Sequence, residues 1–308
     1  MSCGRILAFL QWEGKDQVPR AAHFTECVVD CFQSDAGSSD RAAVCTRLEN
    51  NRLIITDNVT ENAHRLYMKH PSFCPVKHLD ETLVSRLSEV TLSRGVDTGV
   101  AVILESSDGK ILLTKRAAHL RAFPNVWVPP GGHLELDETL TQAGLRELHE
   151  ETGLHVQENE CHEGLLHPLA LWESVYPPKV SLGPPARHHI VLYLLAKLKA
   201  PHTASAMSSR LKFDPNEVAA AVWIDRKMAT AIVQQCEELE QDAEVDPSLP
   251  STIRYMIMQA HVLNEKQEQV EASISLTPFF QRSGETEDCE RVSTGTKYAL
   301  QQYLQRTT

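Results

Sequence analysis

Residues 132–154 read GHLELDETLTQAGLRELHEETGL, and they gather glutamates on both sides of a single arginine, Arg146. Asp137 is a residue type that caps the N-termini of helices, and Glu138 suits a first helical turn. Gly153 is the residue type that most often follows the end of a helix. We therefore predict a helix that begins after Asp137, ends before Gly153 and follows a loop of prolines and glycines.

Three glutamates of the predicted helix, Glu147, Glu150 and Glu151, share one sector of its surface. Each helical residue advances by about 100°, so the three side chains fall within about 100° of one another. Carboxylates one turn apart repel by roughly 0.2–0.5 kcal/mol unless a cation lies between them. Oxygen ligands suit Mg²⁺ or Mn²⁺, whereas zinc prefers nitrogen and sulfur. A solvated acidic helix face is the alternative reading of a glutamate triplet taken alone.

The spacing across the same stretch carries further information. Gly132 is followed after five residues by Glu138, and after seven more by RELHEETGL, residues 146–154. This resembles the Nudix box, G-x5-E-x7-R-E-U-x-E-E-x-G-U with U apolar, at every fixed position. The resemblance implies an α/β/α sandwich with a mixed β-sheet. It also implies an enzyme that hydrolyses a nucleoside diphosphate linked to a further group.

The resemblance assigns roles to particular residues. The glutamates would bind Mg²⁺ or Mn²⁺, which neutralise phosphoryl charge and lower the pKa of a bound water. Gly131 and Gly132 would let the backbone turn sharply and bring a carbonyl near the metal. Arg146 would point away from the metal and pair with Glu138, fixing the loop to the helix. The expected catalytic residues are Arg146, Glu147, Glu150 and Glu151, and the expected metal ligands are these three glutamates with Gly132.

A catalytic partner is expected outside the box, because a metal-activated water often needs one more proton acceptor. Glu217 is the candidate, since it lies just before the alanine-rich strand that leads to Trp223 and could aim its carboxylate at the helix. The alternative is that Glu217 caps a surface turn. Glu173 is a rival that lies within a strand-like run, where it could orient a base or ribose instead.

Further pieces, from GVAVIL at residue 99 to ERVSTGTK at residue 290, resemble a branch of the family that removes RNA caps. The implied reaction is hydrolysis of the N7-methylguanosine-capped RNA end, releasing N7-methyl-GDP, with Mg²⁺ or Mn²⁺. Two alternatives remain open. The first is a diphosphatase of small nucleotides or acyl-CoA. The second, of another class, is a nucleotide-binding module without turnover, which the loss of catalytic glutamates would mark; none is missing here.

Cap recognition favours an aromatic face that stacks on the methylated, positively charged guanine. Trp127 and Trp172 are candidates in the Nudix segment, although a tryptophan is more often a core or rim residue. His188 and His189 open an apolar strand, so their rings should face opposite sides of the sheet. We expect His189 at the substrate, with a packed or solvated histidine as the alternative.

The composition limits the class of protein. The chain has 308 residues, 42% hydrophobic and 23% charged, which is ordinary for a globular protein. Its net charge of −11 disfavours a strong nucleic-acid-binding surface, so a capped end would itself have to provide recognition. No apolar run is long enough to span a bilayer, the N-terminus lacks a cleavable signal pattern, and the cysteines are scattered. We expect a cytoplasmic enzyme without a membrane partner.

Strands, a helix, strands and a helix follow one another without regular βα alternation, which indicates a mixed-sheet α/β sandwich. We expect three parts: residues 1–94 of unknown role, a Nudix domain at 95–240, and a helical extension at 241–308. That extension is predicted to hold one helix at residues 251–269 and another at the C-terminus. The expected core includes Leu104, Leu113, Leu145, Leu148, Val191 and Leu194.

The N-terminal part gives weaker signals. Residues 61–70, ENAHRLYMKH, are predicted to form a short helix. His70, Cys74 and His78 then follow at spacings of four, which raises the question of zinc. Two prolines break any helix that would align them, and no fourth ligand is close in sequence. An irregular loop is therefore the favoured interpretation.

Overall fold

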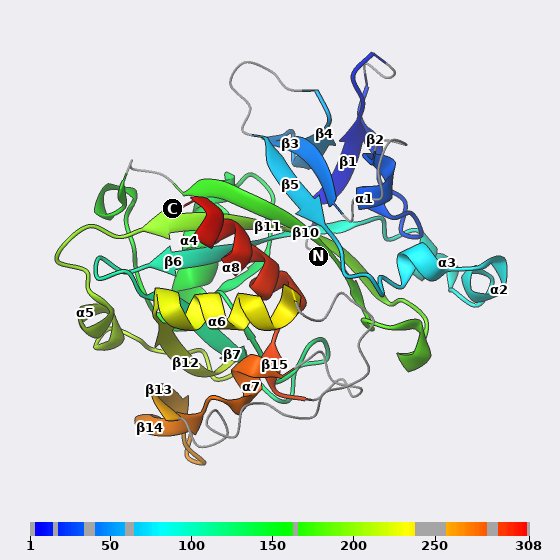
Figure 1. Ribbon diagram of the computed structural model, residues 1–308. Coiled ribbons are helices and arrows are strands. Elements are labelled where there is room, and N and C mark those ends of the chain that lie inside the picture. The colour runs from blue at the N-terminus through cyan, green and yellow to red at the C-terminus, as the bar shows by residue number, and fades with distance from the viewer. Residues whose placement is uncertain are drawn as a thin grey trace. The chain divides into compact units, whose positions relative to one another are not determined.

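The computed structural model describes residues 4–14, 18–33, 41–58, 65–162, 166–237, 257–281 and 289–306. It has a mixed α/β fold with a large mixed β-sheet (Figure 1). The chain divides into two compact units, each assembled from stretches that are far apart in sequence. The first contains Met1–Ala101, Gly132–Gly144 and Pro168–Leu194, and the second contains Val102–Gly131, Leu145–His167 and Leu195–Thr308.

The first unit holds the N-terminal strands. They are β1 (Leu7–Gln11), β2 (Arg20–Ala21), β3 (Arg41–Glu49), β4 (Arg52–Thr56) and β5 (Leu66–Lys69). β1 pairs parallel to β4 and antiparallel to β2, while β3 pairs antiparallel to both β4 and β5. β5 in turn pairs parallel to β10 (His167–Tyr176). The N-terminal strands and β10 are therefore parts of one sheet.

Two asparagines explain the turn between β3 and β4. Asn50 and Asn51 have φ angles of 51° and 58°, and asparagine tolerates this left-handed region better than most residues. Such a pair suits the two-residue turn of an antiparallel hairpin. Strand pairing continues directly on both sides of the turn, with Glu49 opposite Arg52.

The short helix predicted at residues 61–70 is wrong where the structure describes this stretch. Leu66–Lys69 forms strand β5, with Leu66 and Met68 buried and Tyr67 exposed. This is the alternation of a strand, and pairing with β3 on one side and β10 on the other favours it over a helix. Residues 61–64 lie outside the described part.

The second unit is built around β7 (Ile111–Arg116) and β12 (Val218–Ile224), which pair antiparallel. β12 continues to β13 (Ile257–Leu263) and β14 (Gln269–Ser275), and β7 also pairs with β8 (Val126–Val128). β15 (Arg291–Val292) pairs parallel to β8. Helices α6 (Arg226–Glu237) and α8 (Thr294–Arg306) pack against each other, as Figure 1 shows in yellow and red.

Three longer elements pass through residues at which the units divide: β6 (Asp97–Glu105), β11 (Arg187–Lys197) and α4 (Leu140–Thr152). Along β6 every residue except the last is buried, as expected for a strand covered on both faces. Of the predicted core residues, Leu104, Leu113, Leu148 and Leu194 are buried, while Leu145 and Val191 are half-buried.

Short elements connect these strands and helices. The helical ones are α1 (Val28–Cys31), η1 (Val76–His78), α2 (Glu81–Val84), α3 (Glu89–Leu92), η2 (Glu158–Glu160), η4 (Val180–Leu182), α5 (Ala204–Ser208) and α7 (Thr277–Phe280). The remaining strand, β9 (Gly131–His133), belongs to the loop before α4.

The predicted helical extension is partly wrong. The helix expected at residues 251–269 is replaced, where described, by the antiparallel hairpin of β13 and β14. Pairing of β13 with β12 decides this, because a sheet edge supplies backbone partners that a local helical pattern cannot anticipate. The terminal helix is confirmed as α8, and Ser293 Oγ accepts a hydrogen bond from Thr296 N at 2.9 Å at its start.

The expected boundary after residue 94 does not coincide with the division between the two units. Residues 1–94 belong to the unit that also contains Gly132–Gly144 and Pro168–Leu194. The boundary expected near residue 240 lies outside the described residues. The division into residues 1–94, 95–240 and 241–308 therefore stays a prediction.

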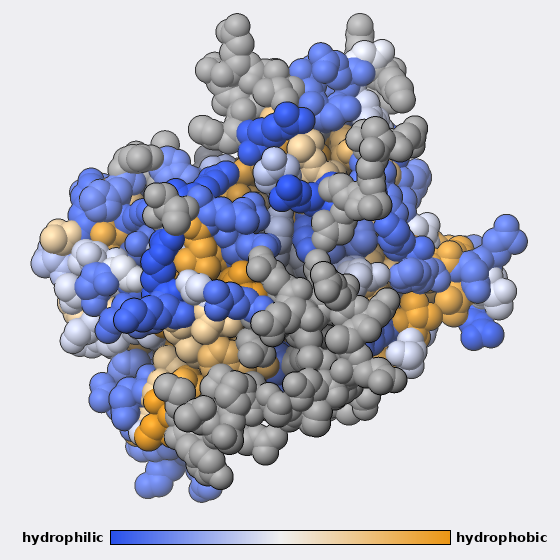
Figure 2. Space-filling model, in the orientation of Figure 1, coloured by the Kyte–Doolittle hydropathy of each residue, from blue (hydrophilic) through white to orange (hydrophobic). Residues whose placement is uncertain are grey.

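The described surface is mostly hydrophilic in the view of Figure 2, and apolar side chains form separate patches. One patch lies over the α2–α3 segment, where Val90 and Leu92 are exposed. Among the helices that the structure describes, none is both long enough and apolar enough to cross a membrane.

Candidate active site

Helix α4 begins at a different cap from the predicted one. Thr139 Oγ1 accepts a hydrogen bond from Gln142 N at 3.2 Å, and Gln142 Oε1 accepts one from Thr139 N at 2.8 Å. This reciprocal arrangement is a capping box. Asp137 has a φ angle of 65° and instead exchanges hydrogen bonds with Asn51. The contact with a distant loop, which the sequence did not reveal, moves the cap two residues along.

The end of α4 is where it was predicted. Gly153 has a φ angle of 70°, and its N–H donates to His149 O at 2.7 Å. A Cβ at this position would lie 2.8 Å from Lys212 Cβ, so both the backbone conformation and the available space favour glycine.

The three glutamates of α4 have unequal surroundings. Glu147 and Glu151 are buried, the latter only 3% exposed, whereas the Glu150 side chain is 58% exposed. Burial raises the pKa of Glu147 to about 7 and that of Glu151 to about 8. Repulsion between the two carboxylates raises the pKa of Glu151 further. The helix thus presents two buried carboxylates, and the surrounding protein does not supply enough positive charge and hydrogen bonds to stabilise both in the ionised form.

Arg146 lies against these glutamates and does not point away from them as predicted. Its Nη1 donates to Glu147 Oε1 at 2.9 Å and to Glu150 Oε2 at 3.0 Å. The arginine side chain is long enough to reach both Glu147 and Glu150 on the helix surface. The position of a residue on the helix therefore does not by itself determine where its charged group lies. The predicted pair with Glu138 stays a prediction.

Strand pairing brings two further charged residues to the glutamates. β12 pairs with β7 so that Val218 lies opposite Arg116, and Ala117 N donates to Glu217 O at 2.8 Å. Glu217 repels both box glutamates and thereby raises their pKa values, while Arg116 opposes the shift at Glu151. Glu217 is therefore electrostatically coupled to the buried carboxylates.

Sequence reasoning missed Arg116. Burial lowers the pKa of its guanidinium, and the charges of Glu151 and Glu217 oppose that effect. Its Nε and Nη2 donate to the carbonyls of Phe123 and Ala122 at 3.1 and 3.2 Å, which holds the side chain in place. The local signal was a pair of cations, Lys115 and Arg116, at the end of a strand that begins with an apolar run, and such residues are common.

The glycines before α4 act through close backbone approach, and they do not form the sharp turn that was predicted. Gly131–His133 is strand β9, whose partner is β6, and the Gly131 N–H donates to Glu151 Oε2 at 3.4 Å. A Cβ at Gly99 would lie only 2.6 Å from Gly132 O. Gly99 therefore makes room for the carbonyl that was expected to bind metal.

These residues fit a divalent metal ion. Glu147 and Glu151 offer oxygen atoms in a buried setting, and their raised pKa values show that the protein alone stabilises two charges there poorly. A divalent cation between them would compensate both charges, and carboxylate oxygens are the ligands that hard cations prefer. Glu150, at the exposed edge, and the Gly132 carbonyl remain candidate ligands.

The two tryptophans expected at the substrate lie in the core. Trp127 is 0% exposed, its Nε1 donates to Glu290 Oε1 at 2.9 Å, and its ring packs on Phe279 at 5.0 Å between centroids. Trp172 is buried in β10 beside β5. Their apolar surface is used for packing, which is the more frequent role of tryptophan.

The two histidines of β11 have different surroundings, as their alternation predicts. His188 is fully buried, and its Nε2 lies 2.9 Å from Glu173 Oε1. Glu173, the rival acceptor, is thus an internal ion-pair partner with no exposed surface. The half-buried His189 has its ring 5.5 Å from that of His133, and burial lowers the pKa of His189 to about 3. A neutral imidazole near the loop before α4 remains a candidate substrate contact.

Comparison with known proteins agrees with this geometry. Residues 96–245 match the family model described as the NUDIX domain. Together with the full-length relatives below, this match places the chain in the Nudix family of hydrolases. The family expected from the box and the mixed α/β fold are confirmed.

The similar proteins include vertebrate enzymes named m7GpppN-mRNA hydrolase NUDT17. The zebrafish protein (Danio rerio) is 43% identical over 301 residues, covering 97% of this chain and 95% of its own. The human protein is 38% identical over 288 residues, covering 93% and 85%. Among solved structures, a MutT protein from Methanosarcina mazei Go1 is 18% identical, with a TM-score of 0.31, over 43% of this chain and 78% of its own.

Proposed function

We propose that this Nudix hydrolase cleaves the pyrophosphate linkage of N7-methylguanosine-capped RNA and releases N7-methyl-GDP, with Mg²⁺ or Mn²⁺ as cofactor. The observation that carries the chemistry is the buried pair of Glu147 and Glu151, whose raised pKa values mark a site suited to a cation. The substrate is supported by the names of relatives that match almost the whole chain.

Each residue of the site has a role in this proposal. When bound, a divalent cation supplies neutralisation of phosphoryl charge and activation of water. Glu147 and Glu151 hold it, and Arg146 orients Glu147 through the 2.9 Å hydrogen bond. Arg116 provides the positive charge that compensates Glu151 and Glu217. Glu217 accepts the proton of the attacking water.

In this proposal the enzyme recognises the cap itself and does not use an extended positively charged surface for the RNA chain. The net charge of −11 disfavours long contacts with RNA phosphates, so the capped end is the recognised part. His189, half-buried and near His133, is the proposed contact to the nucleotide. We further propose that the enzyme acts in the cytoplasm, where capped messages are available.

The test is a panel of pyrophosphate substrates incubated with Mg²⁺ or Mn²⁺, with the products identified by mass. Capped RNA, the free cap dinucleotide, small nucleoside diphosphate derivatives and acyl-CoA form the panel. We expect N7-methyl-GDP from capped RNA with the highest kcat/KM. A higher kcat/KM for a small nucleotide or acyl-CoA would contradict capped RNA as the substrate. Binding without turnover of any compound would show that the protein is a binding module and not an enzyme.

A further inference from the structure

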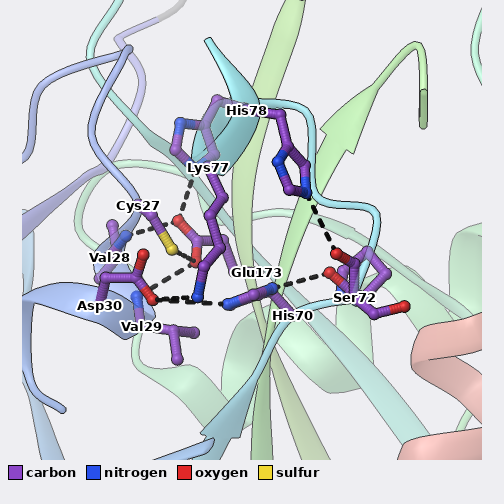
Figure 3. A network of polar contacts seen from close by, with 11 residues as sticks. Cys27, Val28, Val29, Asp30, His70, Ser72, Lys77, His78 and Glu173 are labelled. Atoms are coloured by element: carbon purple, nitrogen blue, oxygen red, sulfur yellow. Dashed lines mark hydrogen bonds and ion pairs between the residues drawn. The ribbon is translucent and has the colours of Figure 1, made fainter. Parts of the chain in front are cut away.

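A second cluster of metal-ligating side chains lies in the first unit, among N-terminal residues that the proposed reaction does not use (Figure 3). Cys27 immediately precedes α1 and Asp30 lies within it, while His70 follows β5. One donor atom of each of these three residues lies within 4.8 Å of the other two. Figure 3 shows Asp30 linked by dashed lines to both His70 and Lys77, with Cys27 nearby.

His70 is the most informative member. It is only 4% exposed, and its Nδ1 lies 2.7 Å from Pro71 O. A carbonyl can only accept, so Nδ1 carries the proton and a neutral ring has its lone pair on Nε2. Among the residues that the structure describes, that buried Nε2 has no hydrogen-bond partner, and it lies 3.7 Å from Asp30 Oδ1, which is also an acceptor. His70 is buried and the Asp30 side chain is 37% exposed, so the two acceptors face each other at the edge of the interior, where a cation between them would satisfy both.

Cys74 provides a fourth candidate ligand. Its side chain is 0% exposed, and although Cys74 is not one of the three mutually close residues, its thiol interacts electrostatically with that of Cys27. Both residues are free cysteines. Two thiols, an imidazole nitrogen and a carboxylate oxygen are the ligand types that zinc accepts in closed, four-coordinate sites.

Glu173 does not compete as a ligand, because its oxygens are already used. Glu173 Oε1 accepts from Val28 N at 2.6 Å and lies 2.9 Å from His188 Nε2, and Oε2 accepts from Val29 N at 3.1 Å. The Cys27 thiol also points to Oε2, at 3.2 Å. A thiol that gives up its proton to bind metal would free this oxygen without leaving Glu173 unpartnered.

We propose that Cys27, Asp30, His70 and Cys74 form a structural zinc site. Binding displaces two thiol protons to solvent and leaves the imidazole neutral, so the metal and its ligands carry one net negative charge. Lys77 Nζ, 3.0 Å from Asp30 Oδ1, offsets that charge. A carboxylate has two oxygens, so Asp30 can bind metal and keep this contact. The site would tie α1 to the loop after β5, two segments about forty residues apart.

The chain offers two matched controls. His78 has the same spacing from Cys74 as His70, yet its Nε2 lies 3.3 Å from Ser72 O. Cys31 lies one turn beyond Cys27, and its Sγ lies 3.8 Å from Glu26 Oε2. Neither belongs to the mutually close group of Cys27, Asp30 and His70, and the polar contacts of both are to atoms outside the proposed site. If metal bound non-specifically to any cysteine or histidine, substitution of His78 or Cys31 would lower the metal content as well.

The experiment measures zinc content of the full-length protein, expressed with zinc and dialysed against a weak chelator, by inductively coupled plasma mass spectrometry. We expect one tightly held zinc per chain in the wild type, in Cys31→Ser and in His78→Gln. Cys27→Ser, Cys74→Ser and His70→Gln should lose it, with affinity lowered by more than the ~10–100-fold that loss of a supporting residue costs. Glu151→Gln should keep it, which separates this site from the box.

Cobalt substitution of the wild type gives a readout that does not depend on variants folding. We expect thiolate-to-cobalt charge-transfer absorption in the wild type and in both control variants. Stoichiometric zinc without this absorption would overturn the proposal, as would wild-type protein without tightly held metal. A disulfide between Cys27 and Cys74 in freshly isolated protein would also overturn it. None of these outcomes bears on capped-RNA hydrolysis, which the substrate panel tests separately.

Discussion

At the scale of single residues, Glu147 and Glu151 combine burial with raised pKa values. We expect Glu147→Gln and Glu151→Gln each to lower kcat by more than the ~10–100-fold typical for loss of a residue that supports a metal ligand. The amide keeps the shape but removes the charge that holds the cation. Steady-state kinetics at saturating Mg²⁺ measures this, with circular dichroism as the control for folding. Near-native turnover in either variant would remove the box from the active site.

The same carboxylates predict how stability depends on pH in metal-free protein. The folded-state pKa of Glu151, about 8, lies above its ordinary value of 4.5, so its favourable contribution is complete below 4.5. That contribution is lost as the pH rises toward 8, with a slope of up to about 1.4 kcal/mol per pH unit. Urea unfolding in chelator, repeated across this window, should show declining stability.

Two comparisons sharpen the pH prediction. Glu151→Gln should reduce the slope, because the variant cannot ionise at that position, and added Mg²⁺ should stabilise the wild type most at the alkaline end. A wild-type stability that rises between these pH values, or that Mg²⁺ leaves unchanged, would contradict a metal-binding role for this pair.

The charge of Glu217 raises the pKa values of both Glu147 and Glu151. We expect Glu217→Gln to bind substrate with little change in KM but to lower kcat by about 10²–10⁴-fold, the usual range for a general base. The loss should be most pronounced at lower pH, where any remaining acceptor is protonated. Glu173→Gln is an instructive comparison, since Glu173 is internal and should change stability more than chemistry. Unchanged kcat of Glu217→Gln across pH would remove it from the mechanism.

At the scale of secondary-structure elements, the end of α4 depends on Gly153. Gly109, in the turn between β6 and β7, has a similar φ angle of 77°, but a Cβ added there would meet no atoms within 4 Å. Gly109→Ala should therefore cost only the left-handed strain, about 1–2 kcal/mol. Gly153→Ala should cost a further ~1–3 kcal/mol, because its Cβ would overlap Lys212. Urea unfolding of both variants measures the difference, and equal losses would contradict the steric argument.

Element-scale patterns explain the corrections as well. Residues 257–263 and 66–69 were predicted as helical, and both are strands whose partners are supplied by segments distant in sequence. The strands expected at His188–His189 and before Trp223 are found as β11 and β12, which contain the apolar and alanine-rich runs from which they were predicted.

At the scale of the whole molecule, the first unit joins residues from three separate stretches. Removing residues 1–94 takes away β5, the partner of β10, along with the buried side chains of Leu66 and Met68. We expect the remaining fragment, 95–308, to lack a cooperative unfolding transition by circular dichroism. Co-expression with the 1–94 fragment is the control, and it should restore the transition. A fragment that unfolds cooperatively by itself would support the division at residue 95.

The sequence by itself predicted the glutamates of the candidate active site. The box lies within one helix and the loop before it, and helical periodicity is a local property, so the shared sector of Glu147, Glu150 and Glu151 could be predicted. Its match to a family pattern added the reaction type. Local periodicity could not say which of the three glutamates is buried, because that depends on what packs against the helix.

The tertiary structure alone decided which distant residues meet. Pairing of β7 with β12 brings Arg116 and Glu217 to the box, and folding of the first unit brings Cys27 and Asp30 to His70. The sequence showed His70 and Cys74 but offered no fourth ligand nearby, since the others come from a segment some forty residues earlier. Contacts of this kind depend on strand pairing and burial across the chain, which residue spacing does not encode.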